Sequence, residues 1–252
     1  MNRAPPRSLG GVVGLGLGLG AWQLVAGRVG PLLLPSPLSV LVALWTERGL
    51  LAGAALQTAE GALAGLAAAV MAGVIVAVAS WASAGLRAAL APWAVFVQVV
   101  PIVAVAPLLI VWVGYGFPVA AITAAIASFY PVYSAASTGL VAPQAEWVEL
   151  MRLYRASRWR ELLDLRVPAA LPAFFSGLRS AAGLAVIGGI VGEFVGSNGD
   201  PPTLGSLVVQ AQRSAALDLG FAAIGMASAL ALLLHAAVRW AERRLIGRWY
   251  GA

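Results

Sequence analysis

The sequence contains no cysteine and no lysine, and it has a single histidine, His235. Without cysteine there are no disulfides, thiol nucleophiles or thiolate metal ligands, and one histidine cannot build a histidine cluster for a metal. Without lysine the chain cannot form a Walker A phosphate loop or a Schiff base with a carbonyl substrate. These absences exclude a P-loop ATPase and several classes of covalent or metal-dependent enzyme.

Charge is scarce as well. Only 10% of the residues are charged and 61% are hydrophobic, whereas a soluble domain is about 25% charged and about 45–50% apolar. Because so few charges cannot cover a water-facing surface, the sequence predicts an all-α, polytopic membrane protein. The net charge of +6 is therefore interpreted as a signal of membrane orientation, and no nucleic-acid partner is expected.

Six apolar segments are candidates for transmembrane helices, each of which needs roughly 20 residues. They run over about 9–25, 55–82, 91–113, 118–140, 168–194 and 222–238. The third segment contains Pro101 and Pro107, so we expect a bent helix there. We divide the chain into residues 1–50, an N-terminal span followed by a proline-rich segment with a short interfacial helix at 38–45, and a core at 51–252. The core has one long polar loop at about 142–167 and a glycine- and proline-rich loop at 196–205.

The arginines are distributed unevenly about these spans. Six spans place both termini and the loops after spans two and four on one side of the membrane. That side carries Arg3, Arg7, Arg87, Arg152, Arg155, Arg158, Arg160, Arg166, Arg239, Arg243, Arg244 and Arg248. The other side carries Arg28, Arg48 and Arg213. The positive-inside rule therefore predicts that both termini and the loop at 142–167 are cytoplasmic. A cleaved signal peptide also fits the first segment, but its loss would break this pattern.

The polar loop carries charged and apolar residues in alternation. Glu146 and Glu149 alternate with Val148, Met151 and Leu153, which predicts a short amphipathic helix. Ser157 can cap a second helix. Two interpretations remain open at this point: a solvated, positively charged loop, or a docking surface for a cytoplasmic protein.

The same loop resembles the EAA loop of binding-protein-dependent ABC importer permeases. That pattern is roughly E-A-A-x-x-x-G-A-S, followed after a short helix by L-P-A-A-L-P, and residues 168–172 read Pro-Ala-Ala-Leu-Pro. The positions that match or replace the first part of the pattern are Glu149, Leu150, Met151, Arg155, Ala156 and Ser157. Arg155 stands where the family usually has a glycine, a residue that suits a tight turn between two helices.

The resemblance covers most of the chain. Residues 33–37 resemble the L-L-P-S-P element of the sulfonate, nitrate and taurine branch, residues 98–114 are similar to its third span, and residues 193–197 are similar to its segment after span five. The chain departs from that branch at residues 200–205 and at Glu60. Because these departures fall where a translocation path could lie, the resemblance does not supply the substrate.

The resemblance implies a type I ABC importer permease fold in the inner membrane. It implies a transmembrane subunit without enzymatic activity, cofactor or metal of its own, which moves a small polar or anionic organic solute. A second copy would complete the pathway, and separate ATPase subunits would bind ATP and Mg²⁺ and dock on the loop at Glu149 to Ser157. A periplasmic or lipid-anchored binding protein would deliver the solute, and membrane lipid would surround the spans.

Polar residues in or beside the apolar spans are the candidates for the translocation pathway. They are Gln98, Tyr130, Glu193 and Ser197. Each has a structural alternative, such as a helix-bridging hydrogen bond for Gln98 or an interfacial carboxylate for Glu193. At the level of the whole chain, the alternative is an ion-coupled secondary transporter, but we find no clear inverted repeat and few charges in the spans. A membrane-embedded enzyme would need a catalytic cluster that the sequence lacks.

Overall fold

The computed structural model of the chain describes residues 7–199 and 201–250, without the side chains of residues 7–10, 12 and 247–250. Within these residues every regular element is helical, which confirms the predicted all-α class. Of the arginines used to predict orientation, Arg3 lies outside the described residues, as do the side chains of Arg7 and Arg248. The helices are α1 (Arg7–Val29), α2 (Pro37–Thr46), α3 (Arg48–Ala82), α4 (Ala84–Val99), α5 (Ile102–Val113), α6 (Phe117–Leu140), α7 (Ala145–Leu153), α8 (Arg158–Arg160), the π-helix η1 (Glu161–Arg166), α9 (Val167–Gly196), α10 (Leu204–Arg213) and α11 (Leu217–Tyr250).

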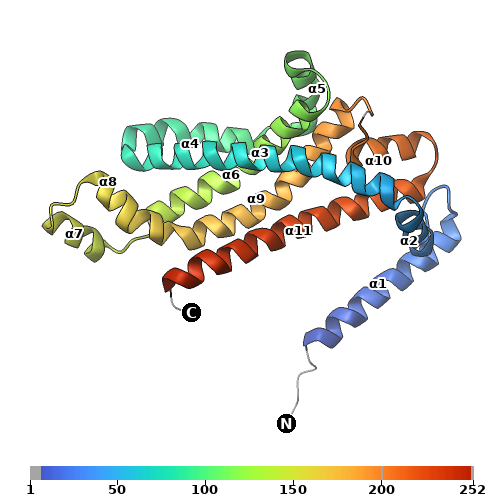
Figure 1. Cartoon of the computed structure of the whole chain (residues 1–252), viewed down its shortest axis with the longest axis horizontal. Helices are drawn as coiled ribbons and strands as arrows, with labels where there is room; N and C mark the ends of the chain where they lie inside the picture. Colours follow the sequence, from blue (N-terminus) through green and yellow to red (C-terminus); the bar gives the residue numbers. More distant parts are fainter. Residues whose placement is uncertain (1–6, 200, 251–252) are drawn as a thin grey trace, which may run out of the picture.

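The long helices run along the longest dimension of the molecule (Figure 1). Four of them are long and apolar enough to cross a membrane among the described residues: α3, α6, α11 and the continuous helix Arg158–Gly196 that joins α8, η1 and α9. The bent pair α4 and α5 makes a fifth crossing if the two count as one span. The first predicted segment, at about 9–25, corresponds to α1, whose apolar stretch over residues 13–29 is shorter than those of the other spans.

The third predicted span is broken more sharply than a bent helix. The axes of α4 and α5 differ by 98°, and α5 turns away from the other helices at the end of α4 (Figure 1). Val100 is extended at φ −60° and ψ 125°, and Pro101 follows at φ −69° and ψ 102°. A proline disfavours the helical conformation of the residue before it. The expectation of one bent helix over 91–113 is therefore wrong, because Pro101 separates two helices.

Helix α6 lies at the centre of the bundle between α3 and α9 (Figure 1). Glycines permit this close approach. A Cβ added at Gly192 of α9 would lie 2.3 Å from Oγ1 of Thr123, and one at Gly65 of α3 would lie 2.5 Å from the Ala121 carbonyl oxygen of α6. Small residues let membrane helices pack backbone to backbone, so the small-residue content of these spans is used for packing against α6.

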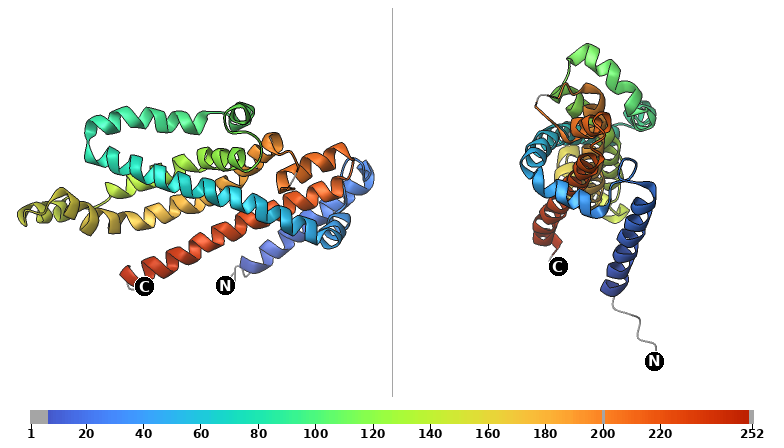
Figure 2. Two further views of the ribbon diagram at one scale, coloured as in Figure 1. Left: turned by 45° about the horizontal axis from the view of Figure 1, so that its top comes forward. Right: turned by 90° about the vertical axis from the view of Figure 1, so that its right-hand side faces the viewer.

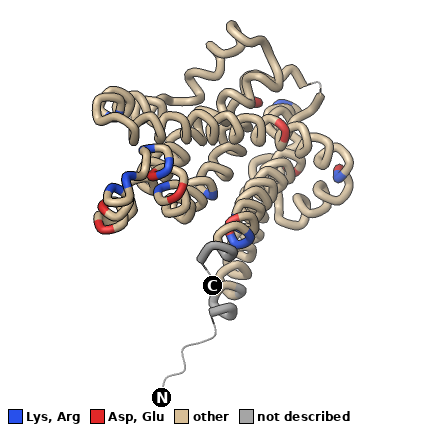
Figure 3. Tube along the Cα trace, turned by 60° about the vertical axis from the view of Figure 1, so that its left-hand side comes forward, with Lys and Arg blue, Asp and Glu red and all other residues tan. Residues whose placement is uncertain are grey.

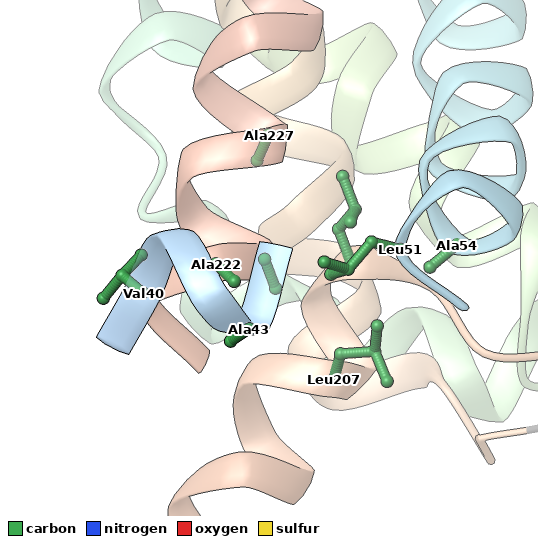
Figure 4. Packing of buried hydrophobic residues seen from close by; sticks show 9 residues of the cluster. Val40, Ala43, Leu51, Ala54, Leu207, Ala222 and Ala227 are labelled. Atoms are coloured by element: carbon green, nitrogen blue, oxygen red, sulfur yellow. The ribbon is translucent and has the colours of Figure 1, made fainter. Parts of the chain in front are cut away.

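A hydrophobic cluster closes the end of the bundle opposite to α7. It joins α2, α3, α10 and α11, and Figure 4 shows its side chains. Its buried members are Val40, Ala43, Leu51, Ala54, Leu204, Leu207, Ala222, Ala223 and Ala227. The loop expected at 196–205 ends earlier than predicted, because Thr203 and Ser206 form a capping box that starts α10 at Leu204.

Helix α1 stands apart from the rest of the bundle (Figure 2, right). Trp22 links it to the core, because its indole Nε1–H donates to the Pro35 carbonyl oxygen at 3.0 Å. The same ring lies 6.0 Å from the Phe221 ring of α11. The short helix predicted at 38–45 is present as α2, where Ser36 caps the first turn and Pro37 occupies the first helical position.

Candidate functional site

The long polar loop at 142–167 folds into two short helices joined by a turn. Helix α7 is followed by residues 154–157, and α8 then continues through η1 into α9. The Ser157 hydroxyl accepts a hydrogen bond from the Arg160 backbone N–H at 3.3 Å, so the predicted capping role of Ser157 is confirmed. The two helices lie beyond the ends of α3 and α6, at one extreme of the molecule (Figure 1).

The turn between α7 and α8 places Arg155 in the left-handed region. Its φ is +50°, its N–H bonds to the Arg152 carbonyl at 2.9 Å, and the Ala156 N–H bonds to the Met151 carbonyl at 2.9 Å. This pair of bonds is a Schellman motif, whose left-handed residue is usually glycine. The position where the family has glycine is thus the position where the backbone favours it.

Helix α7 presents an unburied surface with apolar and charged side chains. None of its residues is buried. Large apolar side chains are exposed along the loop, among them Trp147, Leu150, Leu153, Tyr154 and Trp159, with exposed fractions between 40% and 80%. Of the predicted coupling residues, Glu149, Leu150, Arg155 and Ser157 are exposed, while Met151 and Ala156 are half-buried. Exposed apolar patches of this kind are typical of surfaces that contact another protein or a membrane.

Two arginines fasten the loop to the ends of two spans. Arg158 Nη1 donates to the Ala82 carbonyl oxygen at 3.3 Å, at the C-terminus of α3. Arg166 Nη1 donates to the Leu140 carbonyl oxygen at 2.7 Å, at the C-terminus of α6. Cationic side chains at helix C-termini satisfy the last carbonyls and interact favourably with the helix dipole. These two hydrogen bonds join the loop to the C-terminal ends of α3 and α6.

Arg166 makes the larger set of contacts. Its guanidinium also pairs with Glu161 Oε1 at 2.6 Å and lies 5.4 Å from the centre of the Trp81 ring on α3. Its side chain is only 14% exposed. Next to it, Leu162 of η1 is buried in a cluster with Tyr133 and other residues of α3, α4, α6 and α9. The sequence prediction did not single out Arg158 or Arg166, although both belong to the arginines that fix the orientation.

Glu193 of α9 is buried at the opposite end of the molecule, where it is held by residues of α3 and α10. Its Oε2 accepts hydrogen bonds from the Thr58 hydroxyl at 3.0 Å and from the Gly205 N–H at 2.9 Å. Thr58 Oγ1 in turn accepts from the Leu204 N–H at 3.0 Å. The carboxylate therefore sits at the N-terminus of α10, where the helix dipole favours negative charge, and it fastens α10 to α3 and α9.

The predicted pathway residues fall into two groups. Glu193 and Ser197 line one small cavity of about 80 Å³, together with Gln57, Asn198 and Thr203. Gln98 lies elsewhere, exposed on the last turn of α4, and Tyr130 is half-buried on α6 with its ring 6.3 Å from that of Tyr133. Glu60 is exposed on α3. Among these, only Glu193 and Ser197 are brought together, and Thr58 and Gln57 are residues of this region that the sequence prediction missed.

Residues 69–247 match the family described as the binding-protein-dependent transport system inner membrane component. The chain belongs to this family. The match includes the whole loop with α7 and α8, and it confirms the assignment to the ABC importer permeases that the EAA-like pattern indicated. It also favours this class over an ion-coupled secondary transporter, and it identifies the chain as a multi-pass inner-membrane protein.

Curated relatives agree with the family. A probable ABC transporter permease of Haemophilus influenzae is 39% identical over 59% of this chain and 60% of its own length. The riboflavin transport system permease of Chloroflexus aurantiacus is 34% identical over 60% of this chain and 55% of its own length. The taurine transport system permease of Escherichia coli is 30% identical over 60% of this chain and 54% of its own length. The chain thus spans a little over half the length of these relatives.

Proposed function

We propose that the chain is the transmembrane permease subunit of an ATP-driven importer and that the loop carrying α7 and α8 couples it to a separate ATPase subunit. The observation that carries this proposal is the loop itself. Its apolar side chains Trp147, Leu150 and Leu153 are exposed outside the spans, while Arg158 and Arg166 tie it to α3 and α6. A docked partner would cover the apolar surface, and its movement would reach the spans through the two arginines.

The orientation follows from the positions of the arginines. Basic residues gather on the loop and toward the C-terminal end of α11 (Figure 3). We place this end in the cytoplasm, together with both termini, because the cytoplasmic side of membrane proteins carries the excess of arginine and lysine. The cluster of α2, α3, α10 and α11 is then on the periplasmic side, where a binding protein would deliver the solute.

The remaining partners are proposed from the family. ATP and Mg²⁺ would be bound by the ATPase subunit, since the chain lacks the lysine of a phosphate loop. A second copy of this chain would complete the pathway by twofold symmetry. The solute is proposed to be a small polar or anionic organic molecule, in keeping with relatives named for riboflavin and taurine transport.

The test is co-purification of the chain with an ATPase subunit encoded by a neighbouring gene, followed by ATP hydrolysis and solute uptake in liposomes. Glu149→Arg reverses a charge on the exposed surface of α7 and should weaken ATPase association about tenfold or more, as for a charge that loses its partner in an interface. Ala156→Asp should act in the same direction by crowding the half-buried end of the turn.

The matched control is Glu47→Arg, which reverses another exposed charge, between α2 and α3 at the other end of the molecule. This variant should associate with the ATPase subunit as the unaltered chain does. If Glu149→Arg and Ala156→Asp both leave association and transport unchanged, the loop is not the coupling element.

A further inference from the structure

A polar cavity of about 280 Å³ lies between α3, α4 and α6 at the arginine-rich end of the bundle. Its polar lining comes from Ser80 and Trp81 of α3, Arg87 of α4, and Tyr133, Ser137 and Thr138 of α6. It is separate from the exposed surface of α7 and from the small cavity beside Glu193. None of the residues that line it is acidic, so the Arg87 guanidinium gives the cavity a positive potential.

Two residues that line this cavity carry a buried hydroxyl with no hydrogen-bond partner among the described residues. Ser80 Oγ and Ser137 Oγ are buried and make no hydrogen bond among the described residues, and Ser80 as a whole is 3% exposed. Buried polar groups are normally hydrogen-bonded, so each exception requires an explanation such as a ligand. Arg87 is oriented at the same place, because its Nε–H donates to the Ser80 carbonyl oxygen at 3.2 Å. A guanidinium beside free hydroxyl donors is the chemistry that binds an oxyanion.

The same three helices form a second, apolar cavity of about 260 Å³. Its lining includes Ala72 of α3, Val97 of α4 and Phe129 of α6. Ala72 precedes Ser80 by eight residues, and Phe129 precedes Ser137 by eight, which corresponds to about 12 Å along a helix. The polar cavity therefore lies at the end of the spans, and the apolar cavity lies about two turns deeper along the same helices. This arrangement matches an amphipathic ligand with an anionic head and an apolar tail.

We propose that the two cavities bind an anionic phospholipid of the cytoplasmic leaflet, with its phosphate among Arg87, Ser80 and Ser137 and an acyl chain toward Ala72. Basic pockets between helices on the cytoplasmic side are the sites where anionic lipid headgroups bind. Trp81 lies at the end of α3 that the proposed orientation places on the cytoplasmic side, and tryptophan is enriched at membrane interfaces. The proposal rests on the proposed orientation of the chain but not on its transport activity.

The experiment is native mass spectrometry of the purified chain titrated with phosphatidylglycerol or with phosphatidylcholine. Phosphatidylglycerol should be retained in preference to phosphatidylcholine, and Arg87→Gln should weaken its retention about tenfold, the usual effect of losing a charge-assisted hydrogen bond. Arg239→Gln is the matched control, because it removes an exposed arginine from the same end of the molecule. It should retain the lipid within about twofold of the unaltered chain.

A double variant, Ser80→Ala with Ser137→Ala, removes the two hydroxyls and keeps the charge. It should weaken retention about fivefold, and it decides the question if Arg87→Gln does not fold. Equal retention of the two lipids, or unchanged retention by the double variant, would overturn the proposal.

Inorganic phosphate and a steric variant separate the lipid from a free oxyanion. Ala72→Phe fills the apolar cavity and should weaken the binding of phosphatidylglycerol, while Arg87 remains able to bind a phosphate group. If phosphate binds in an Arg87-dependent manner and phosphatidylglycerol does not bind, the occupant is a free anion and the lipid is excluded. Because every arm is a binding measurement on the isolated chain, its failure leaves the proposed transport function untouched.

Discussion

The two ends of the molecule differ in how many of their polar and apolar side chains are buried or paired by contacts within the chain. At the end with α10, the Glu193 carboxylate is paired with Thr58 and Gly205, and a hydrophobic cluster joins α2, α3, α10 and α11. At the other end, no residue of α7 is buried and aromatic side chains such as Trp147 and Tyr154 are exposed. The first end is held by contacts of the chain itself, whereas the second leaves large apolar side chains exposed.

This contrast distinguishes the residues that stabilise the fold from the residues that we propose to couple the chain to an ATPase subunit. Contacts at the α10 end bury apolar area and satisfy polar groups, which are the terms that determine the free energy of unfolding. The loop adds little burial of its own and is linked to the bundle through Arg158, Arg166 and Leu162. Substitutions at the α10 end should therefore change stability, and substitutions on the loop should change assembly or transport.

The largest effect on stability is expected for Glu193→Ala. The substitution leaves the Thr58 hydroxyl and the Gly205 N–H without their acceptor, and each buried unsatisfied group costs about 1–3 kcal/mol. We expect a loss of about 2–5 kcal/mol, measured by thermal unfolding in detergent. Glu60→Ala is the control, since Glu60 is exposed on α3, and it should change stability by less than about 0.5 kcal/mol. Equal effects of the two substitutions would contradict the role assigned to Glu193.

The sequence predicted the spans at 55–82, 118–140, 168–194 and 222–238 well, because their apolar runs are long and few residues interrupt them. The resemblance to the EAA loop indicated a turn at Arg155, and the sequence offered Ser157 as a helix cap. It did not predict α10, and it did not predict that Pro101 divides the third span into two helices. A ten-residue helix with polar and apolar residues mixed has no long run to mark it, and a proline within a span predicts either a kink or a break.

The sequence did not predict which residues that are far apart along the chain contact each other. Thr58 and Glu193 are 135 positions apart, so neither residue indicates the other.

A local pair was also missed. Arg166 and Glu161 are five positions apart, a spacing that brings side chains together in a π-helical turn rather than in an ordinary α-helix. Their pairing could have been predicted only by someone who already expected the π-helix.

The second effect is expected for Arg166→Gln, which tests the link between the loop and the spans. Glutamine removes the charge that pairs with Glu161 and the donor to the Leu140 carbonyl. The free energy that holds the loop to the end of α6 should therefore fall by about 1–3 kcal/mol. We expect the ATPase subunit to bind normally while solute uptake per ATP hydrolysed falls severalfold in liposomes. Arg243→Gln, an exposed arginine of α11, should leave this ratio unchanged. A loss of ATPase binding with an unchanged ratio would place Arg166 in docking instead.

The smallest effects are expected for substitutions in one turn motif that occurs at both ends of the molecule. Arg155 after α7 and Ala215 after α10 both have positive φ, at +50° and +57°. After α10 the Ala216 N–H bonds to the Ala211 carbonyl at 3.0 Å, as Ala156 bonds to Met151 after α7. Glycine has no Cβ to be strained in this conformation, so Arg155→Gly and Ala215→Gly should each stabilise their own turn by about 1 kcal/mol. Arg155→Gly should also leave ATPase association intact.

The same local gain should have different consequences, because α10 is packed into the hydrophobic cluster and α7 is not. Ala215→Gly should raise the midpoint of thermal unfolding of the whole chain by a small amount, whereas Arg155→Gly should leave that midpoint unchanged. Its gain should be confined to slower hydrogen exchange of the amides of α7, which can open without the bundle. If Arg155→Gly raises the global midpoint as much as Ala215→Gly does, the loop unfolds together with the spans, and the distinction between a self-contained end and an open end fails.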